Sequence, residues 1–263
     1  MPNVLLNGVD LYYEIHGKGD PLLLVAGLAS DSQSWLPIMD ELSRHYQVIT
    51  FDNRGVGRTK PQDAKTSIRL MTDDGVALIK YLGLSSVHLL GHSMGGLIAL
   101  DLAIRYPQYV SKLILASTSA HNSARNNALF NDWVSYLENG MKPELWFRNF
   151  FYWIFTKHFF EDKGALDNAV QLAIEYPYQQ TATAFKNQVH ALEAFNCQQE
   201  LSDIKSKTMV ICGKEDLLFS PEESSGVLKA IPGAEFYFVD HAAHAIPLEK
   251  PKEFVNIVRL FLR

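Results

Sequence analysis

The sequence predicts an α/β fold in which a mostly parallel sheet is flanked by helices and interrupted by one helical insertion. Short apolar runs alternate with longer helix-like segments, which is the pattern of βαβ units. One run, PLLLVA at 21–26, is almost entirely apolar, as expected for a strand covered on both faces of a sheet. Residues 122–195 then break the rhythm, because they contain no clear strand but many aromatic residues.

Each expected element has a local signal. Asn7-Gly8 is a hairpin-type turn between the first two strands. Tyr106-Pro107 ends the helix before it, since proline disfavours helical backbone in the preceding residue. The eight expected strands are 3–6, 11–16, 21–26, 46–51, 87–90, 112–116, 208–212 and 235–239. The expected helices outside the insertion are 34–43, 68–82, 97–105, 221–230 and 251–262. The chain thus divides into a first core part, 1–121, the insertion, 122–195, and a second core part, 196–263.

Composition narrows the class of protein. The chain has 263 residues, a net charge of −5 and scattered lysines and arginines, which argues against a nucleic-acid partner. The apolar stretch 150–155 is far shorter than a membrane span, so no membrane insertion is expected. Cys197 and Cys212 do not form a disulfide framework, and so few cysteines are consistent with a cytoplasmic protein.

The stretch Leu89-Leu90-Gly91-His92-Ser93-Met94-Gly95-Gly96 points to a nucleophile. A strand ends and a helix begins within about one turn, so a non-glycine residue at the bend is strained, often with a positive φ. Glycines two residues before and after Ser93 relieve the crowding there. The pattern is the G-x-S-x-G nucleophile elbow, in which the Met94 N–H becomes an oxyanion donor. The alternative is a serine that only caps the helix.

With this motif the chain resembles the α/β-hydrolase family, from residue 11 to 262, with the insertion as the family's cap. The resemblance implies that an acid and a histidine follow the serine in the chain. In the family the acid often ends a G-x-x-D sequence after the strand that follows the insertion. Gly213-Lys214-Glu215-Asp216 fits, so Asp216 is the expected acid and Glu215 the adjacent alternative.

The family's histidine stands in the loop after the last strand, often as H-x-x-x-x-E-x-P. His244, Glu249 and Pro251 fit that spacing, whereas His241 does not. His241 and His244 could also form an H-x-x-H metal pair, but the sequence offers no third ligand at a characteristic spacing. We therefore expect His244 as the base, and neither a metal nor a cofactor.

The second oxyanion donor in the family comes from the loop after the third strand. Ala26-Gly27-Leu28 stands there, so the Leu28 N–H is the expected donor. The segment 51–58 resembles the family's D-x-R-G-x-G-x-S loop. We expect it to be structural, with Asp52 and Arg54 pairing or bonding to backbone groups.

The resemblance implies a serine hydrolase that acts on a small-molecule ester or lactone. The aromatic insertion favours a substrate with an apolar acyl or ring portion, with Leu28 and Met94 walling the pocket and Trp35 and Trp133 as possible lining residues. Dehalogenase and epoxide-hydrolase activities are disfavoured, because those relatives carry aspartate where this chain has Ser93. C–C bond hydrolysis, cofactor-free haloperoxidation and ligand binding without turnover remain alternatives on the same scaffold.

Overall fold

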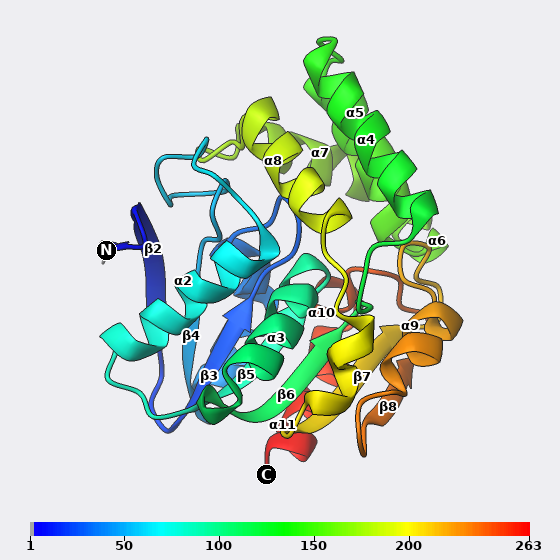
Figure 1. The fold of residues 1–263 in the computed structure, drawn as a ribbon. Coiled ribbons are helices and arrows are strands. Elements are labelled where there is room, and N and C mark those ends of the chain that lie inside the picture. The colour runs from blue at the N-terminus through cyan, green and yellow to red at the C-terminus, as the bar shows by residue number, and fades with distance from the viewer. Residues whose placement is uncertain (1–2) are drawn as a thin grey trace.

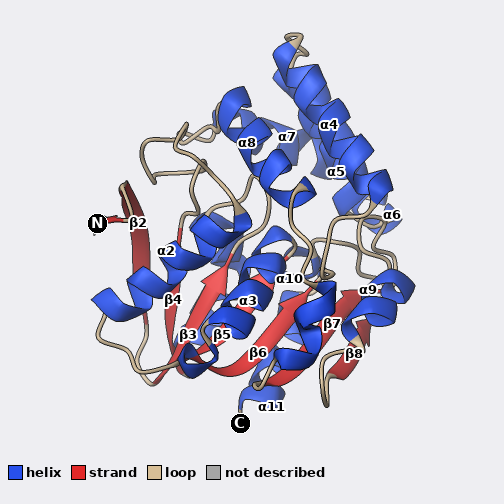
Figure 2. Ribbon diagram, in the orientation of Figure 1, coloured by secondary structure: helices blue, strands red, loops and turns tan. Residues whose placement is uncertain are grey.

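The computed structural model describes residues 3–263 and contains the predicted sheet, with strands in the order β1-β2-β4-β3-β5-β6-β7-β8 (Figures 1 and 2). The β1–β2 and β2–β4 pairs are antiparallel, and every later pair is parallel. The strands are β1 (Asn3–Leu6), β2 (Val9–His16), β3 (Asp20–Val25), β4 (Tyr46–Phe51), β5 (Val87–His92), β6 (Val110–Ala116), β7 (Lys207–Gly213) and β8 (Glu235–Val239). The helices of the flanking layers are α1 (Leu36–Ser43), α2 (Ile68–Tyr81), α3 (Met94–Arg105), α9 (Pro221–Leu228), α10 (Ile246–Glu249) and α11 (Pro251–Leu262).

Alternating strand residues feed two separate apolar cores, one on each face of the sheet. Leu89 and Leu113 lie in the larger core with residues of α2 and α3, whereas Leu90 and Ile114 lie in the smaller core with residues of α1 and α11. Period-two alternation sends neighbouring side chains to opposite faces, so a strand buried on both faces must be apolar throughout. This is why the apolar runs predicted the strands.

The helical insertion lies between β6 and β7 and consists of α4 (Ala124–Glu138), α5 (Pro143–Ile154), α6 (Lys157–Glu161), α7 (Ala165–Glu175) and α8 (Ala182–Glu193). Figure 2 shows it as helices and loops alone, and in Figure 1 α4 and α5 extend together away from the sheet. Among the described residues, no helix is both long and apolar enough to cross a membrane.

The strand-to-helix turn at Ser93 is tighter than the sequence predicts. We expected β5 to end at Leu90 and the next helix to begin at 97, but β5 continues to His92 and α3 begins at Met94. Gly95 and Gly96 have low intrinsic helix propensity, which misleads a prediction from local sequence, but close packing against the neighbouring backbone favours them here. A single residue, Ser93, therefore makes the whole turn.

Candidate active site

Ser93 is held in a strained conformation at the amino end of α3. Its backbone has φ 55° and ψ −122°, which non-glycine residues rarely adopt. The Ser93 N–H donates to the Ala116 carbonyl at 2.9 Å, and the Thr118 hydroxyl donates to the Ser93 carbonyl at 2.8 Å. Hydrogen bonds from the neighbouring strand thus hold the serine in a conformation that it would not adopt alone.

The two glycines flanking Ser93 are required by close backbone approach. A Cβ on Gly91 would overlap the Gly95 carbonyl group, and a Cβ on Gly95 would overlap the Val25 carbonyl group. Neither obstacle is a flexible side chain that could turn aside. Only glycine therefore lets β3, β5 and α3 meet at this bend.

Asp216 and His244 form a buried pair. Asp216 follows β7, His244 lies in the loop after β8, and the two side chains join through a 3.0 Å contact between Asp216 Oδ2 and His244 Nδ1. The second carboxylate oxygen, Oδ1, accepts from the Leu218 and Phe219 N–H groups at 2.8 and 3.0 Å. A carboxylate fixed at both oxygens orients the imidazole and favours the tautomer with its proton on Nδ1.

Ser93 and His244 line one cavity of about 80 Å³. Among the hydrogen bonds of the described residues, none joins these two side chains. Leu28, Trp35 and Trp133, which we expected at the pocket, line it too. Met94, which we also expected to wall the pocket, is buried and is not among the residues that line this cavity. The remaining lining is mostly apolar and comes from both the sheet loops and the insertion: Gly27, Ser30, Ser34, His92, Phe130, Phe150, Ile154, Leu218, Ala245, Pro247 and Leu248.

The two expected oxyanion donors lie at this cavity's edge of the sheet. Met94 is the first residue of α3, so its N–H has no partner within the helix. Leu28 follows β3 in the same loop as Gly27, where a Cβ on Gly27 would come within 3.0 Å of the Ser93 Cβ. The loop after β3 therefore runs directly beside the serine.

The loop that follows β4 is tied down by buried ion pairs, as expected for a structural element. Asp52 accepts from the Arg58 backbone N–H at 2.8 Å and from its side-chain Nε at 2.9 Å. Arg54 pairs with Asp74 through both its Nε and its Nη2, and Nη2 also donates to the Asn7 carbonyl at 2.7 Å. Asp52 and Arg54 do bond to backbone groups, but they do not pair with each other: Asp52 pairs with Arg58 of the same loop, and Arg54 pairs with Asp74 of α2.

His92 lies inside the elbow, where the sequence leads us to expect that it supports the turn rather than acts as the base. Its Nε2 donates to the His244 carbonyl oxygen at 2.8 Å, and the two rings lie 5.0 Å apart. Burial, and to a smaller extent the charge of the nearby His244, lower the pKa of His92 to about 4. His92 is therefore neutral near pH 7, with its Nε2 proton holding the loop of His244.

Glu249 provides a second support for that loop. Its Oε2 accepts from the Ala243 N–H at 2.8 Å, and its Oε1 accepts from the N–H and hydroxyl of Thr156 at 2.8 Å each. The spacing motif identified Glu249, but nothing in the local sequence indicates that its partner lies in the insertion. The carboxylate thus links the histidine loop to the start of α6.

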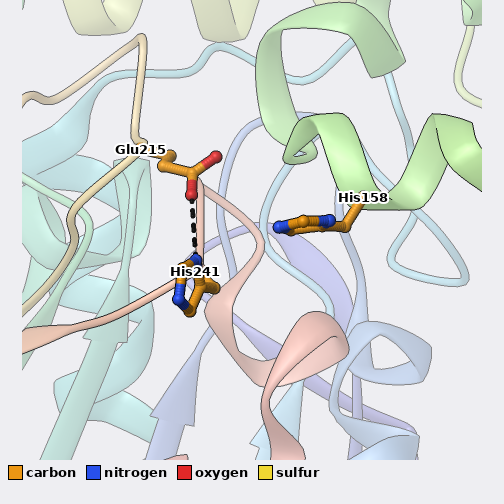
Figure 3. A group of neighbouring side chains, drawn as sticks. All are labelled: His158, Glu215 and His241. Atoms are coloured by element: carbon orange, nitrogen blue, oxygen red, sulfur yellow. Dashed lines mark ion pairs between the residues drawn. The ribbon is translucent and has the colours of Figure 1, made fainter.

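The alternative acid and base lie together outside this cavity. Glu215 Oε1 is 3.6 Å from His241 Nδ1, and His158 of α6 completes a group in which one ligand atom from each residue lies within 4.8 Å of the others (Figure 3). The H-x-x-H pair considered from sequence does not come together in this way: His241 belongs to this group and His244 does not. Among residues 3–263, the group that could hold a metal ion is His158, Glu215 and His241.

Comparison with known proteins agrees with this geometry. Residues 20–251 match the family described as the alpha/beta hydrolase fold. The chain belongs to this family. A relative from Agrobacterium fabrum named "Putative carbamate hydrolase RutD" is 29% identical to this α/β-hydrolase, over 96% of this chain and 98% of the relative.

Solved structures share the same fold. The enol-lactonase from Burkholderia xenovorans has a TM-score of 0.88 at 23% identity, covering 99% of each chain. A thermophilic esterase from Thermogutta terrifontis has a TM-score of 0.86 at 24% identity, covering 99% of this chain and 96% of its own. At these identities the likeness establishes the arrangement of sheet and helices for this α/β-hydrolase.

Proposed function

We propose that this α/β-hydrolase cleaves a small carboxylic ester or lactone through an acyl-enzyme formed on Ser93. The observation that carries the proposal is the buried Asp216–His244 pair, whose imidazole shares a cavity with the strained Ser93. Serine is a weak nucleophile near neutral pH and needs a base that is itself oriented by an acid. Here Asp216 is the orienting acid and His244 is the base.

The first step is attack of the Ser93 hydroxyl on the substrate carbonyl. His244 Nε2 takes the hydroxyl proton, and Asp216 stabilises the imidazolium that results. Ser93 and His244 would form this hydrogen bond in the substrate complex, since catalytic contacts often tighten only when substrate binds. His244 then gives its proton to the leaving alcohol, and water releases the acyl group by the same steps in reverse order.

Negative charge on the carbonyl oxygen is stabilised by the N–H groups of Leu28 and Met94. Met94 adds the positive end of the α3 dipole, since its N–H is one of the unpaired donors at the helix amino terminus. Loss of one such donor lowers turnover roughly a hundred- to a thousand-fold in comparable enzymes.

The size and lining of the cavity favour a small substrate with an apolar part. A volume of about 80 Å³ is well below the roughly 300–1,000 Å³ of pockets for drug-sized ligands. The insertion contributes Phe130, Trp133, Phe150 and Ile154 to the lining, so we propose that it acts as a cap over residues 1–121 and 196–263 of the core. An acetyl- or propionyl-sized acyl group fits these properties.

A small carbamate is the second candidate substrate. The relatives named as carbamate hydrolases match nearly the whole chain, and one from Rhizobium rhizogenes is 30% identical. A carbamate carbonyl can be attacked by the same serine, with His244 protonating a departing amine instead of an alcohol. Comparing kcat/KM for acetate esters, small lactones and alkyl carbamates distinguishes the two candidates.

The deciding experiment combines turnover with covalent labelling. We expect the protein to hydrolyse p-nitrophenyl acetate and to be modified on Ser93 by a fluorophosphonate, as located by peptide mass spectrometry. Ser93→Ala should abolish both signals. Ser30→Ala is the matched control, because Ser30 lines the same cavity but is not at the bend, and it should retain both. Saturable ligand binding with no turnover of any ester, lactone or carbamate would instead identify a receptor.

A further inference from the structure

His158, Glu215 and His241 form a group of neighbouring side chains (Figure 3). None of the three lines the cavity that holds Ser93, and none is a proposed catalytic residue. The three side chains come from different segments: α6 of the insertion, the loop after β7 and the loop after β8. Glu215 directly precedes Asp216, and His241 is three residues before His244. An ion bound by all three would therefore connect α6 with the two loops that carry the acid and the base.

From this arrangement we propose that His158, Glu215 and His241 form a binding site for one divalent transition-metal ion, of which Zn²⁺ is the best match. Two imidazoles and one carboxylate suit Zn²⁺ and its neighbours, whereas Mg²⁺ and Ca²⁺ prefer oxygen ligands alone. Three protein ligands leave the fourth tetrahedral position for water.

The distances allow such a site after a small contraction. Zinc-to-ligand bonds of about 2.0–2.2 Å at tetrahedral angles place ligand atoms roughly 3.3 Å apart. Glu215 Oε1 and His241 Nδ1 are already 3.6 Å apart, and the ligand atoms of the three residues all lie within 4.8 Å of one another. The His158 and His241 side chains are half or more exposed, so they can turn toward an ion without disturbing the core.

Neighbouring side chains determine which nitrogen of His158 is available to bind the ion, and they offset a nearby positive charge. Glu161 Oε2 lies 2.9 Å from His158 Nδ1, which leaves Nε2 free to bind the ion. A carboxylate on the second nitrogen is the usual support of a metal-bound histidine. Lys214, next to Glu215, is paired with Asp240 at 2.7 Å, which offsets its positive charge near the site.

Zn²⁺ binding to the full-length, chelator-treated protein tests the proposal by isothermal titration calorimetry in the absence of any ester. We expect one Zn²⁺ per chain, and affinity at least tenfold weaker in each of His158→Gln, Glu215→Gln and His241→Gln. The midpoint of thermal unfolding of the wild type should rise by about 5 °C at a hundred-fold excess of free Zn²⁺ over its dissociation constant, and by clearly less in the three ligand variants at the same Zn²⁺ concentration. Millimolar Mg²⁺ should not compete.

Two control variants make the result specific. His45→Gln removes an exposed histidine that is paired with Glu41 at 3.5 Å. Within the described part of the chain, His45 belongs to no group of three possible metal ligands. The affinity of this variant for Zn²⁺ should therefore equal that of the wild type. His244→Gln should also retain binding. Wild-type affinity in His158→Gln, or loss of binding in His244→Gln, would overturn the proposal. The binding measurement does not depend on hydrolysis, so it can fail or succeed independently of the proposed esterase activity.

Discussion

The loops at the carboxyl edge of the sheet and helices α4 and α5 meet at the same cavity but are held by different interactions. On the sheet side, Asp52 is fully buried and accepts from the Ser32 N–H at 2.9 Å as well as from Arg58. On the insertion side, Trp133 packs against Phe130 and Phe150 with ring centroids 5.0 Å apart in both pairs. Directional hydrogen bonds dominate on the sheet side of the cavity, and apolar ring contacts dominate on the side of the insertion.

This difference suggests two separate tasks: the sheet side positions the candidate catalytic residues, and the insertion shapes the cavity. Hydrogen bonds and ion pairs weaken steeply with angle, so they hold the Ser93 and His244 backbones in one arrangement. Apolar contacts have little directional preference, and a packed cluster tolerates a volume-conserving substitution far better than a polar deletion. We therefore expect changes on the sheet side to affect turnover or folding, and changes in the insertion to affect mainly substrate binding.

The largest effect should come from Asp216→Asn. The amide still accepts from the Leu218 and Phe219 N–H groups through Oδ1, so the fold should survive. It no longer favours the Nδ1 proton of His244, and the same change in a serine protease lowers kcat roughly ten-thousand-fold. We expect a loss of this size in p-nitrophenyl acetate hydrolysis, with an unchanged circular dichroism spectrum.

Glu215→Gln is the matched control for the acid. Glu215 lies beside the exposed His241 rather than at His244, so chelator-treated protein should keep kcat within about threefold of the wild type, as expected for a surface change remote from the reacting atoms. A larger loss in Glu215→Gln than in Asp216→Asn would exchange the roles of the two carboxylates.

The next largest effect, a loss of stability, should come from adding a methyl group at the turn around Ser93. Gly95→Ala forces a Cβ against the Val25 carbonyl, and the free energy of unfolding should fall by about 3 kcal/mol or more in urea denaturation. Gly226→Ala in α9 adds the same methyl group where no atom lies within 4 Å, and should stabilise the protein by up to about 1 kcal/mol. Equal stability changes in the two variants would contradict the close approach of β3 and α3.

The insertion should respond differently, and Trp133→Phe tests this. The Trp133 indole is fully buried, lines the cavity and donates from Nε1 to Asn149 at 2.7 Å. Phenylalanine keeps an apolar ring but loses that bond, so unfolding should become easier by about 1–2 kcal/mol. KM should change several-fold while kcat stays within about twofold, because the lost contact is the same in ground and transition states.

Trp153→Phe provides the comparison within the insertion. Trp153 lies one helical turn beyond Phe150 on α5, is partly buried and does not line the cavity. The same substitution there should leave KM unchanged. A kcat loss in Trp133→Phe as large as that in Asp216→Asn would remove the distinction between the two sides of the cavity.

The strands and the elbow could be predicted because their signals in the sequence are local. A run such as 21–26 must be apolar at nearly every position when both faces are covered, and the glycines on either side of Ser93 mark the bend even though Gly95 meets the distant Val25 carbonyl. The candidate acid and histidine came from the family's spacing motifs, whose residues here follow β7 and β8. These features need no knowledge of how distant segments pack.

Contacts between distant segments could not be predicted. His92 bonds to a carbonyl 152 positions away, and Glu249 reaches Thr156, 93 positions away. The neighbours of His158 likewise depend on where α6 packs, and aromatic residues spread along 122–195 do not fix that position. The helix boundaries of the insertion were also not predicted, since aromatic density does not mark them: α5 is rich in aromatic rings, whereas α7 contains none.

The smallest effect expected concerns His92 and pH. Burial lowers its folded-state pKa from an ordinary 6.5 to about 4, so between these values the unfolded chain binds more protons than the folded one. Stability therefore falls as pH falls through this window, by about 1 kcal/mol at pH 5.5 from this group. His92→Gln can still donate to the His244 carbonyl but does not titrate. Urea denaturation should show that the free energy of unfolding falls between pH 7.5 and pH 5.5 by about 1 kcal/mol less in the variant than in the wild type.

Asp31 and Asp74, whose carboxyl pKa values are raised by burial, titrate in both proteins, so their contributions cancel in the difference. Identical pH dependence in the two proteins would mean that folding does not shift the pKa of His92, and that the support it gives to the base is different from the one described.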